Sequence, residues 1–223
     1  QYQNGDQISI PVEQIHLLSK YVSSDGKAPK LNKLNDGHFK KAKQKVKNQV
    51  EDIADDLIKL YSERSQLKGF AFSADDEDQH AFDDAFPYVE TDDQLRSVEE
   101  IKRDMQASQP MDRLLVGDVG FGKTEVAMRA AFKAVNDHKQ VVVLVPTTVL
   151  AQQHYTNFKE RFQNFAVNID VLSRFRSKKE QAETLEKLKN GQVDILIGTH
   201  RVLSKDVVFS DLGLMIIDEE QRF

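Results

Sequence analysis

The chain has 223 residues, enough for one large domain or for one domain with an appendage. It contains no cysteine, which excludes disulfide scaffolds, thiol nucleophiles, zinc ribbons and iron–sulfur clusters. Its net charge of −5 argues against a protein whose whole surface binds nucleic acid, although a local DNA site stays compatible with this charge.

The sequence predicts neither a membrane-spanning segment nor a secretion signal. Hydrophobic residues make up 39% of the chain, and the longest clean apolar run, Val141 to Val145, is far shorter than the roughly 20 residues that span a bilayer. The start QYQNGDQISI has neither the basic nor the apolar region of a signal peptide. We therefore expect a soluble, cytoplasmic protein with no membrane partner.

Residues 1–34 are expected to be the last part of a small β domain. Ile8, Ile10 and Val12 alternate as in a strand, and Asn-Gly-Asp at 4–6 is a turn signal. Two strands are not stable alone, so this segment is predicted to be the remnant of a larger sheet.

Residues 35–90 are expected to form a linker dominated by one long connector helix. Between residues 39 and 68 there is no proline or glycine, and apolar residues recur at steps of three and four: Phe39, Ala42, Val46, Val50, Ile53, Leu57 and Tyr61. The acidic run Asp75 to Asp78 follows at an expected helix start, where carboxylates favour the positive end of the dipole. For this run we expect helix capping and solubility rather than a metal site.

After Met111 the pattern changes to strands alternating with helices. Continuous apolar strands of this kind predict a parallel sheet covered on both faces, with ligands at the carboxyl ends of the strands. The predicted strands are Leu114 to Val116, Val141 to Val145, Ile169 to Leu172, Ile195 to Ile197 and Leu214 to Ile217.

A phosphate-binding loop stands directly after the first of these strands. The sequence GDVGFGKT fits G-x-x-x-x-G-K-[ST] and opens a helix, which is the context that this motif requires. Backbone N–H groups and Lys123 are expected to bind the phosphates, and Thr124 to bind Mg²⁺. The predicted nucleotide contacts of the loop are Gly117, Asp118, Val119, Gly120, Phe121, Gly122, Lys123 and Thr124.

The strand that ends at Ile217 is followed by Asp218 and Glu219. We expect Asp218 to hold Mg²⁺ through water and Glu219 to act as the general base that polarises the attacking water. Glu219 beside Asp218 disfavours a nucleotide-dependent scaffold without turnover. A small-molecule kinase is disfavoured too, because residues 191–223 contain no arginine-rich lid.

The motifs resemble those of the superfamily 2 DNA helicases and translocases, whose first RecA-like lobe carries them in this order. The segments FPYVETDDQ, DRLLVGDVGFGKTEVAMRAAFKA, PTTVLAQQH, LSRFRSKKEQ, ILIGTHRVLS and IIDEEQRF are similar to the bacterial transcription-repair coupling factors, from about Val12 to Phe223. This resemblance implies an ATP-dependent translocase on double-stranded DNA that displaces stalled RNA polymerase. The RNA polymerase β subunit and a nucleotide excision repair damage-recognition protein are the implied protein partners.

The resemblance implies that residues 91–223 are the first RecA-like lobe and that Gln94 contacts adenine. Thr91 to Gln94 also has the form of a capping box, so a local cap is an alternative for Gln94. DNA contacts are implied for residues after the strand ends, each of which could instead cap or pack: Thr147, Gln152, Arg174, Thr199, His200 and Arg201.

A branch-migrating helicase of the RecG type is the closest alternative, because its lobe has a related phosphate loop and Asp-Glu box. LSRFRSKKEQ and the segment before the lobe favour the coupling factors. The chain starts without Met and stops directly after a motif, so we expect a fragment of a longer protein that lacks full activity.

Overall fold

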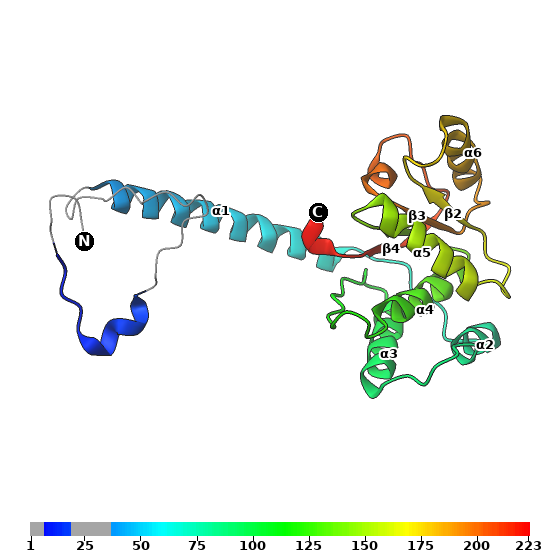
Figure 1. The fold of residues 1–223 in the computed structure, drawn as a ribbon, viewed down its shortest axis with the longest axis horizontal. Coiled ribbons are helices and arrows are strands. Elements are labelled where there is room, and N and C mark those ends of the chain that lie inside the picture. The colour runs from blue at the N-terminus through cyan, green and yellow to red at the C-terminus, as the bar shows by residue number, and fades with distance from the viewer. Residues whose placement is uncertain (1–6, 19–36) are drawn as a thin grey trace. The chain divides into compact units, whose positions relative to one another are not determined.

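The computed structural model describes residues 7–18 and 37–223 (Figure 1). The chain divides into two compact units, Gln1–Arg64 and Ser65–Phe223. The predicted turn at 4–6 and the stretch 19–34 lie outside the described residues. Residues 7–11 have no regular structure and lead into the 3₁₀-helix η2, Val12–Leu17, so the strand predicted through Ile8 and Ile10 is wrong. Pro11 O accepts from Gln14 N at 2.9 Å and starts the turn that leads into η2.

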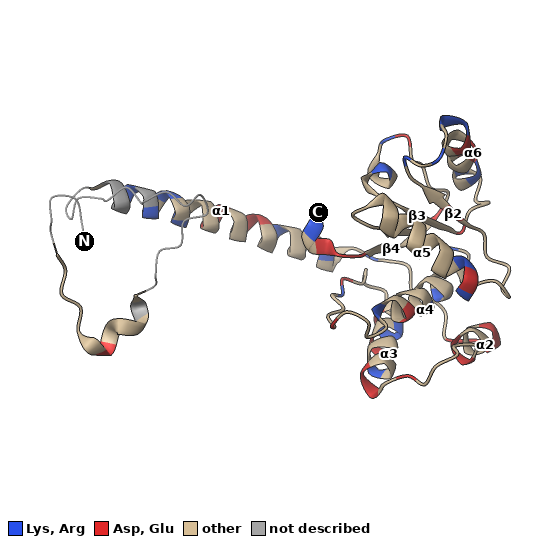
Figure 2. Cartoon of the chain, in the orientation of Figure 1, with Lys and Arg blue, Asp and Glu red and all other residues tan. Residues whose placement is uncertain are grey.

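The long helix is confirmed as α1, Gly37–Gln66. Figure 2 shows lysines in its first half and acidic residues further along, joined by pairs such as Lys47–Glu51 at 3.5 Å. Its described apolar stripe, which includes Val46, Val50 and Ile53, is exposed; the predicted stripe positions Phe39 and Ala42 fall among side chains outside the described set. In the described part of the chain, no helix combines the length and the apolar character that a bilayer crossing needs.

The second unit contains the predicted parallel sheet. Its strand order is β2-β3-β1-β4, and every neighbouring pair is parallel. Val142 in the central strand is in register with Leu196 on one side and Met215 on the other. The strands are β1 Gln140–Leu144, β2 Ile169–Leu172, β3 Ile195–Gly198 and β4 Leu212–Ile217.

Helices cover both faces of this sheet, as predicted. Val141 and Val143 belong to a core that includes Phe132, whereas Val142 belongs to a second core that includes Leu188. This division follows from the strand period of two, which sends successive side chains to opposite faces. The helices are α2 Glu77–Asp84, α3 Asp92–Gln106, α4 Lys123–Asn136, α5 Thr148–Arg161 and α6 Lys178–Lys189, with short 3₁₀-helices η3 His200–Leu203 and η4 Glu220–Arg222.

The predicted strand Leu114 to Val116 is wrong, because these residues have no strand pairing in the structure. Leu114 is 68% exposed and Val116 is 81% exposed. The described sheet ends at β4, which pairs with β1 and with no further strand. The preceding Arg113 donates to Glu100 and Asp104 of α3, each at 2.6 Å. These ion pairs hold the start of the segment along α3.

The acidic segment before the lobe is only partly what the sequence predicts. Asp76 caps α2 by accepting from Gln79 N at 2.9 Å, which confirms the capping role. Asp75 is not merely solubilising: it accepts from Lys102 at 2.6 Å and from Lys133 at 2.7 Å in a largely buried setting. These contacts attach the segment to α3 and α4.

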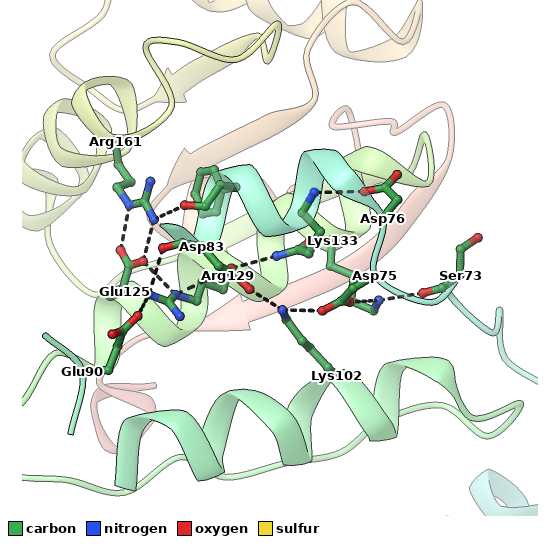
Figure 3. Close-up of polar contacts among 12 residues, drawn as sticks. Ser73, Asp75, Asp76, Asp83, Glu90, Lys102, Glu125, Arg129, Lys133 and Arg161 are labelled. Carbon is green, nitrogen blue, oxygen red and sulfur yellow. Dashed lines mark hydrogen bonds and ion pairs between the residues drawn. The ribbon is translucent and has the colours of Figure 1, made fainter. Parts of the chain in front are cut away.

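The same network continues around Arg129 of α4, whose side chain is only 4% exposed (Figure 3). Arg129 donates to Glu90 at 2.5 Å and to Glu125 at 2.9 Å. Arg161 of α5 also donates to both oxygens of Glu125, at 2.8 and 3.0 Å. Glu125 directly follows Thr124, so a buried ionic cluster lies immediately behind the phosphate loop.

Candidate active site

The phosphate loop, residues 117–124, has a backbone that depends on glycine. Gly120 and Gly122 have φ angles of 84° and 74°, in the left-handed region that residues with a Cβ rarely adopt. Gly122 is the N-cap of α4, and a Cβ there would also collide with the Gln94 amide. The first N–H groups of a helix have no partner within the helix, so the loop presents backbone donors at the positive end of α4.

Lys123, the first residue of α4, lies over this loop. Its ammonium donates to the carbonyl oxygens of Gly117, at 2.6 Å, and Asp118, at 2.9 Å. These acceptors are neutral, and phosphate oxygens offer the ammonium a stronger, charge-assisted hydrogen bond. Thr124 follows in the first turn of the helix and is half-buried.

Asp218 comes directly after β4 and is held from two sides. Its backbone N–H donates to Leu144 O at 2.9 Å, and its Oδ2 accepts from His154 Nε2 at 2.8 Å. The His154 hydrogen bond holds the pKa of the Asp218 carboxyl below its usual range, against the opposing effect of burial, and the charge of Lys123 acts in the same direction. Asp218 is therefore an ionised carboxylate within electrostatic range of the phosphate loop.

Glu219 turns the chain away from the strand. Its φ of 56° lies in the left-handed region, which is unusual for a residue with a long side chain. Its carboxylate is exposed and accepts from Gln221 Nε2 at 2.6 Å. The general base predicted at this position is thus accessible and not engaged in an ion pair with Lys123.

These residues fit a nucleotide with Mg²⁺. A threonine hydroxyl and an ionised carboxylate are the hard oxygen donors that Mg²⁺ prefers, and Mg²⁺ commonly completes its shell with waters and substrate phosphates. Among the described residues, no group of three or more His, Cys, Asp or Glu side chains could hold a metal alone. The donor set therefore suits an ion that arrives with phosphate oxygens, and the predicted Mg²⁺ contacts of Thr124 and Asp218 stay a prediction.

Gln94 connects the start of α3 to the phosphate loop. Its Oε1 accepts from Thr91 N at 2.9 Å and its backbone N–H donates to Thr91 Oγ1 at 3.2 Å, which is the capping box. Its Nε2 donates to Phe121 O at 3.0 Å. The capping alternative is therefore present in the structure, and the adenine contact stays a prediction.

A hollow of about 390 Å³ lies at the carboxyl ends of β1, β2 and β3. It brings together five of the six residues for which DNA contact is predicted, whereas the exposed Gln152 lies one turn along α5 and is not in its lining. Parallel strands explain the convergence, because their carboxyl ends meet at one edge of the sheet. The lining residues are Pro146, Thr147, Thr148, Arg174, Gln181, Thr199, His200 and Arg201.

The polar side chains that line this hollow differ in the hydrogen bonds and ion pairs that they already make. Thr147 caps α5 by accepting from Leu150 N at 3.2 Å. Arg201 makes a two-pronged ion pair with Asp206 at 2.6 and 2.7 Å. Arg174 is exposed, and its guanidinium lies 6.0 Å from the ring of Phe175. Arg174 is thus the lining cation that a phosphate could reach without breaking an ion pair with Asp206.

Two residues of the site carry no role in the sequence-based prediction. Gln181 lines the hollow and donates to the carbonyl oxygens of Ser173, at 3.3 Å, and Arg176, at 2.9 Å, which shapes the loop bearing Arg174. His154 belongs to the PTTVLAQQH segment, but its partner Asp218 is 64 positions away. No local signal could have identified that pair.

The chain is similar to known proteins. The family model described as DEAD/DEAH box helicase matches residues 91–223. The transcription-repair-coupling factor of Bacillus subtilis (strain 168) is 65% identical over 222 residues, which cover 100% of this chain and 19% of that protein. The chain therefore spans about a fifth of the length of that curated relative.

Two solved structures resemble this chain. RecG bound to a three-way DNA junction matches with a TM-score of 0.70 and 38% identity, over 74% of this chain and 23% of that one. A hypothetical ATP-dependent RNA helicase from Sulfolobus tokodaii matches with a TM-score of 0.50 and 17% identity, over 66% of this chain and 42% of that one. At that identity the second match supports the fold alone, a parallel sheet covered by helices.

Proposed function

Because the chain belongs to the DEAD/DEAH box helicase family, we propose that residues 91–223 are the nucleotide-binding lobe of an ATP-dependent double-stranded DNA translocase. The observation that carries this proposal is that Asp218, directly after β4, lies within electrostatic range of Lys123. A hollow lined by hydroxyl and guanidinium groups lies at the carboxyl ends of β1, β2 and β3. ATP is the proposed substrate, and Mg²⁺ supplies charge neutralisation when it is bound with the nucleotide.

In this proposal each residue of the phosphate site has a separate task. Backbone N–H groups at Gly122 and the start of α4 bind the phosphate oxygens, and the Lys123 ammonium leaves its loop carbonyls to contact the terminal phosphates. Thr124 and Asp218 hold the Mg²⁺. Glu219, exposed and close to Asp218 in the chain, accepts a proton from the attacking water.

The hollow is the proposed DNA contact. Hydroxyl and guanidinium groups bind phosphates without reading bases, which suits a motor that moves along any sequence. Arg174 supplies the accessible cation, and Thr199 and His200 lie at the neighbouring strand end. The RecG match, a protein solved with a DNA junction, supports DNA rather than RNA as the polymer.

We further infer that the whole protein couples transcription to DNA repair in the cytoplasm. The support is the 65% identity to a transcription-repair-coupling factor across the full chain, including residues before 91 that lie outside the helicase-family match. On this inference, the polymerase β subunit and a damage-recognition protein of excision repair are partners of the whole protein. Branch migration of the RecG type is the alternative that the 38% identity to RecG keeps open.

The test is ATP hydrolysis by the full-length protein with and without duplex DNA. Lys123→Ala should abolish hydrolysis, because the loop loses the cation that contacts the terminal phosphates. Glu219→Gln should keep nucleotide affinity and stop turnover, because binding depends on Lys123, Thr124 and Asp218 instead. Arg103→Ala, an exposed change on α3, serves as the control and should behave like wild type.

Wild-type turnover in Lys123→Ala would refute the site, and a joint loss of binding and turnover in Glu219→Gln would make Glu219 a metal or structural residue. Release of stalled RNA polymerase from duplex DNA separates the coupling role from the RecG-type alternative. A protein that unwinds branched DNA but leaves stalled polymerase in place would favour that alternative.

A further inference from the structure

We propose that His154 is a positioning residue that couples the DNA-facing helix α5 to Asp218, so that DNA binding at the hollow adjusts the carboxylate of the nucleotide site. The inference rests on the proposed function, because it needs DNA at the hollow and a nucleotide at the phosphate loop. It assigns a task to a buried histidine that neither the loop nor the hollow explains.

The first support is how His154 is built into the lobe. Its side chain is 11% exposed, and its ring centroid lies 6.2 Å from that of Phe158 one turn further along α5. Nε2 is within 2.8 Å of Asp218 Oδ2, and an ionised carboxylate can only accept, so Nε2 carries the hydrogen. The other ring nitrogen, Nδ1, is buried without a hydrogen-bond partner among the described residues.

That orphaned nitrogen is informative. A buried polar atom without a partner costs about 1–3 kcal/mol, so an apolar side chain of similar size would suit the core better if the residue only filled space. The contact that offsets this cost is the one with Asp218. The histidine is therefore best explained by its effect on that carboxylate.

The second support is the mechanical continuity of α5. The helix begins at Thr148 with Thr147 as its cap, and both residues line the hollow. His154 lies about two turns further along the same helix, roughly 10 Å from that end. A ligand that shifts the start of a regular helix also shifts the imidazole, since the turns between them are joined by backbone hydrogen bonds.

The third support concerns the groups that hold the Asp218 carboxylate. The backbone of Asp218 is fixed to the end of β1 by the hydrogen bond to Leu144 O. Its Oδ2 accepts from His154, and the backbone N–H of Glu219 also interacts with the carboxylate, so His154 is the contact that comes from α5 and can move with that helix. Residues that orient a metal ligand in this way typically change metal affinity or activity by about 10–100-fold when they are replaced.

The experiment measures binding coupling in the full-length protein. A non-hydrolysable ATP analogue is titrated with Mg²⁺ in the presence and absence of a short duplex DNA, and the ratio of the two dissociation constants is the coupling. Such ratios are typically about 5–150. His154→Leu fills the site without a donor, His154→Gln can place an amide donor near Nε2, and Gln153→Ala on the exposed neighbour is the control.

We expect His154→Leu to lower the coupling ratio about 10-fold or to abolish it, and His154→Gln to restore part of it. In an Asp218→Asn background, His154→Leu should have no further effect on Mg²⁺-dependent analogue affinity, because the histidine acts through the carboxylate. A histidine with a merely structural role would lower melting temperature and reduce both affinities without changing their ratio, and its effect would persist in the Asp218→Asn background.

A coupling ratio in His154→Leu within about twofold of wild type overturns the inference while leaving the proposed function standing. If wild type binds both the analogue and DNA but neither ligand changes the affinity for the other, the inference is overturned as well. If wild type binds neither ligand, the proposed function itself fails. Should His154→Leu not fold, the same ratio measured in His154→Gln against Gln153→Ala decides, and an unchanged ratio again overturns the inference.

Discussion

Replacing Arg129 with alanine should destabilise the lobe strongly, although the residue contacts none of the predicted ligands. Its side chain is 4% exposed and lies among the carboxylates of Asp83, Glu90 and Glu125, at 3.7, 2.5 and 2.9 Å. Those carboxylates are themselves 17%, 25% and 10% exposed, so water cannot fully replace the lost guanidinium. In the variant, these three carboxylates lose the guanidinium that contacts all of them (Figure 3).

The expected cost follows from how the partners are left. Removing one member of a buried pair usually costs about 3–5 kcal/mol. Glu125 keeps both contacts with Arg161, and Asp83 keeps Lys102 at 2.5 Å, so Glu90 alone loses its hydrogen-bonded cation while the charge of Arg161 still acts on it. We therefore expect the lower end, about 3 kcal/mol, which corresponds to about 6–12 °C in melting temperature for a domain of this size class.

The assay is a thermal melt of Arg129→Ala against Arg96→Ala. Arg96 also pairs with a carboxylate, Asp93 at 2.7 Å, but that pair is 70% and 82% exposed. Exposed pairs contribute about 0–1 kcal/mol, so Arg96→Ala should change the melting temperature by no more than about 4 °C. Equal shifts in the two variants would refute the reasoning, because burial would then not matter. The shift in Arg129→Ala should also persist at high salt, which screens exposed pairs more than buried ones.

Two further predictions concern pH and DNA. The hydrogen bond from Arg129 holds the pKa of the Glu90 carboxyl below its usual range, so Glu90 contributes stability that is complete above its unfolded pKa and is lost as pH falls through the lower folded value. The melting temperature should therefore fall more steeply between pH 5 and 3 for wild type than for Arg129→Ala. Equal slopes of melting temperature against pH in the two proteins would contradict this cause. Arg174→Ala should weaken binding to two unrelated duplexes equally and reduce the salt slope by about one unit, as measured by anisotropy at several salt concentrations. A sequence-dependent loss would contradict a phosphate contact, and Arg103→Ala is again the control.

Much of this lobe could be predicted because the decisive signals are local. The capping box at Thr91 specifies where α3 begins through side chains three residues apart. The glycines at 120 and 122 permit the left-handed turns of the phosphate loop whatever the surroundings. Apolar runs and their period likewise predict four of the strands, since burial on two faces requires continuous hydrophobic residues.

The failures share one cause, which is dependence on partners far away in the chain. The run Leu114 to Val116 is as apolar as a short strand, but Arg113 is tied to α3 and no neighbouring strand pairs with it in the described sheet. Ile8 and Ile10 alternate correctly and still form no strand, because alternation cannot supply a partner.

The sequence by itself predicted the phosphate loop, since its glycines, lysine and threonine are contiguous and the backbone geometry of the glycines is local. Only the tertiary structure decided which distant charges meet: Asp75 with Lys102 and Lys133, and Asp218 with His154. Such pairs are separated by 27 to 64 positions, and an ionisable side chain does not signal its partner through local spacing. Packing of the helices on the sheet brings these groups together, and burial then gives each pairing its energetic weight.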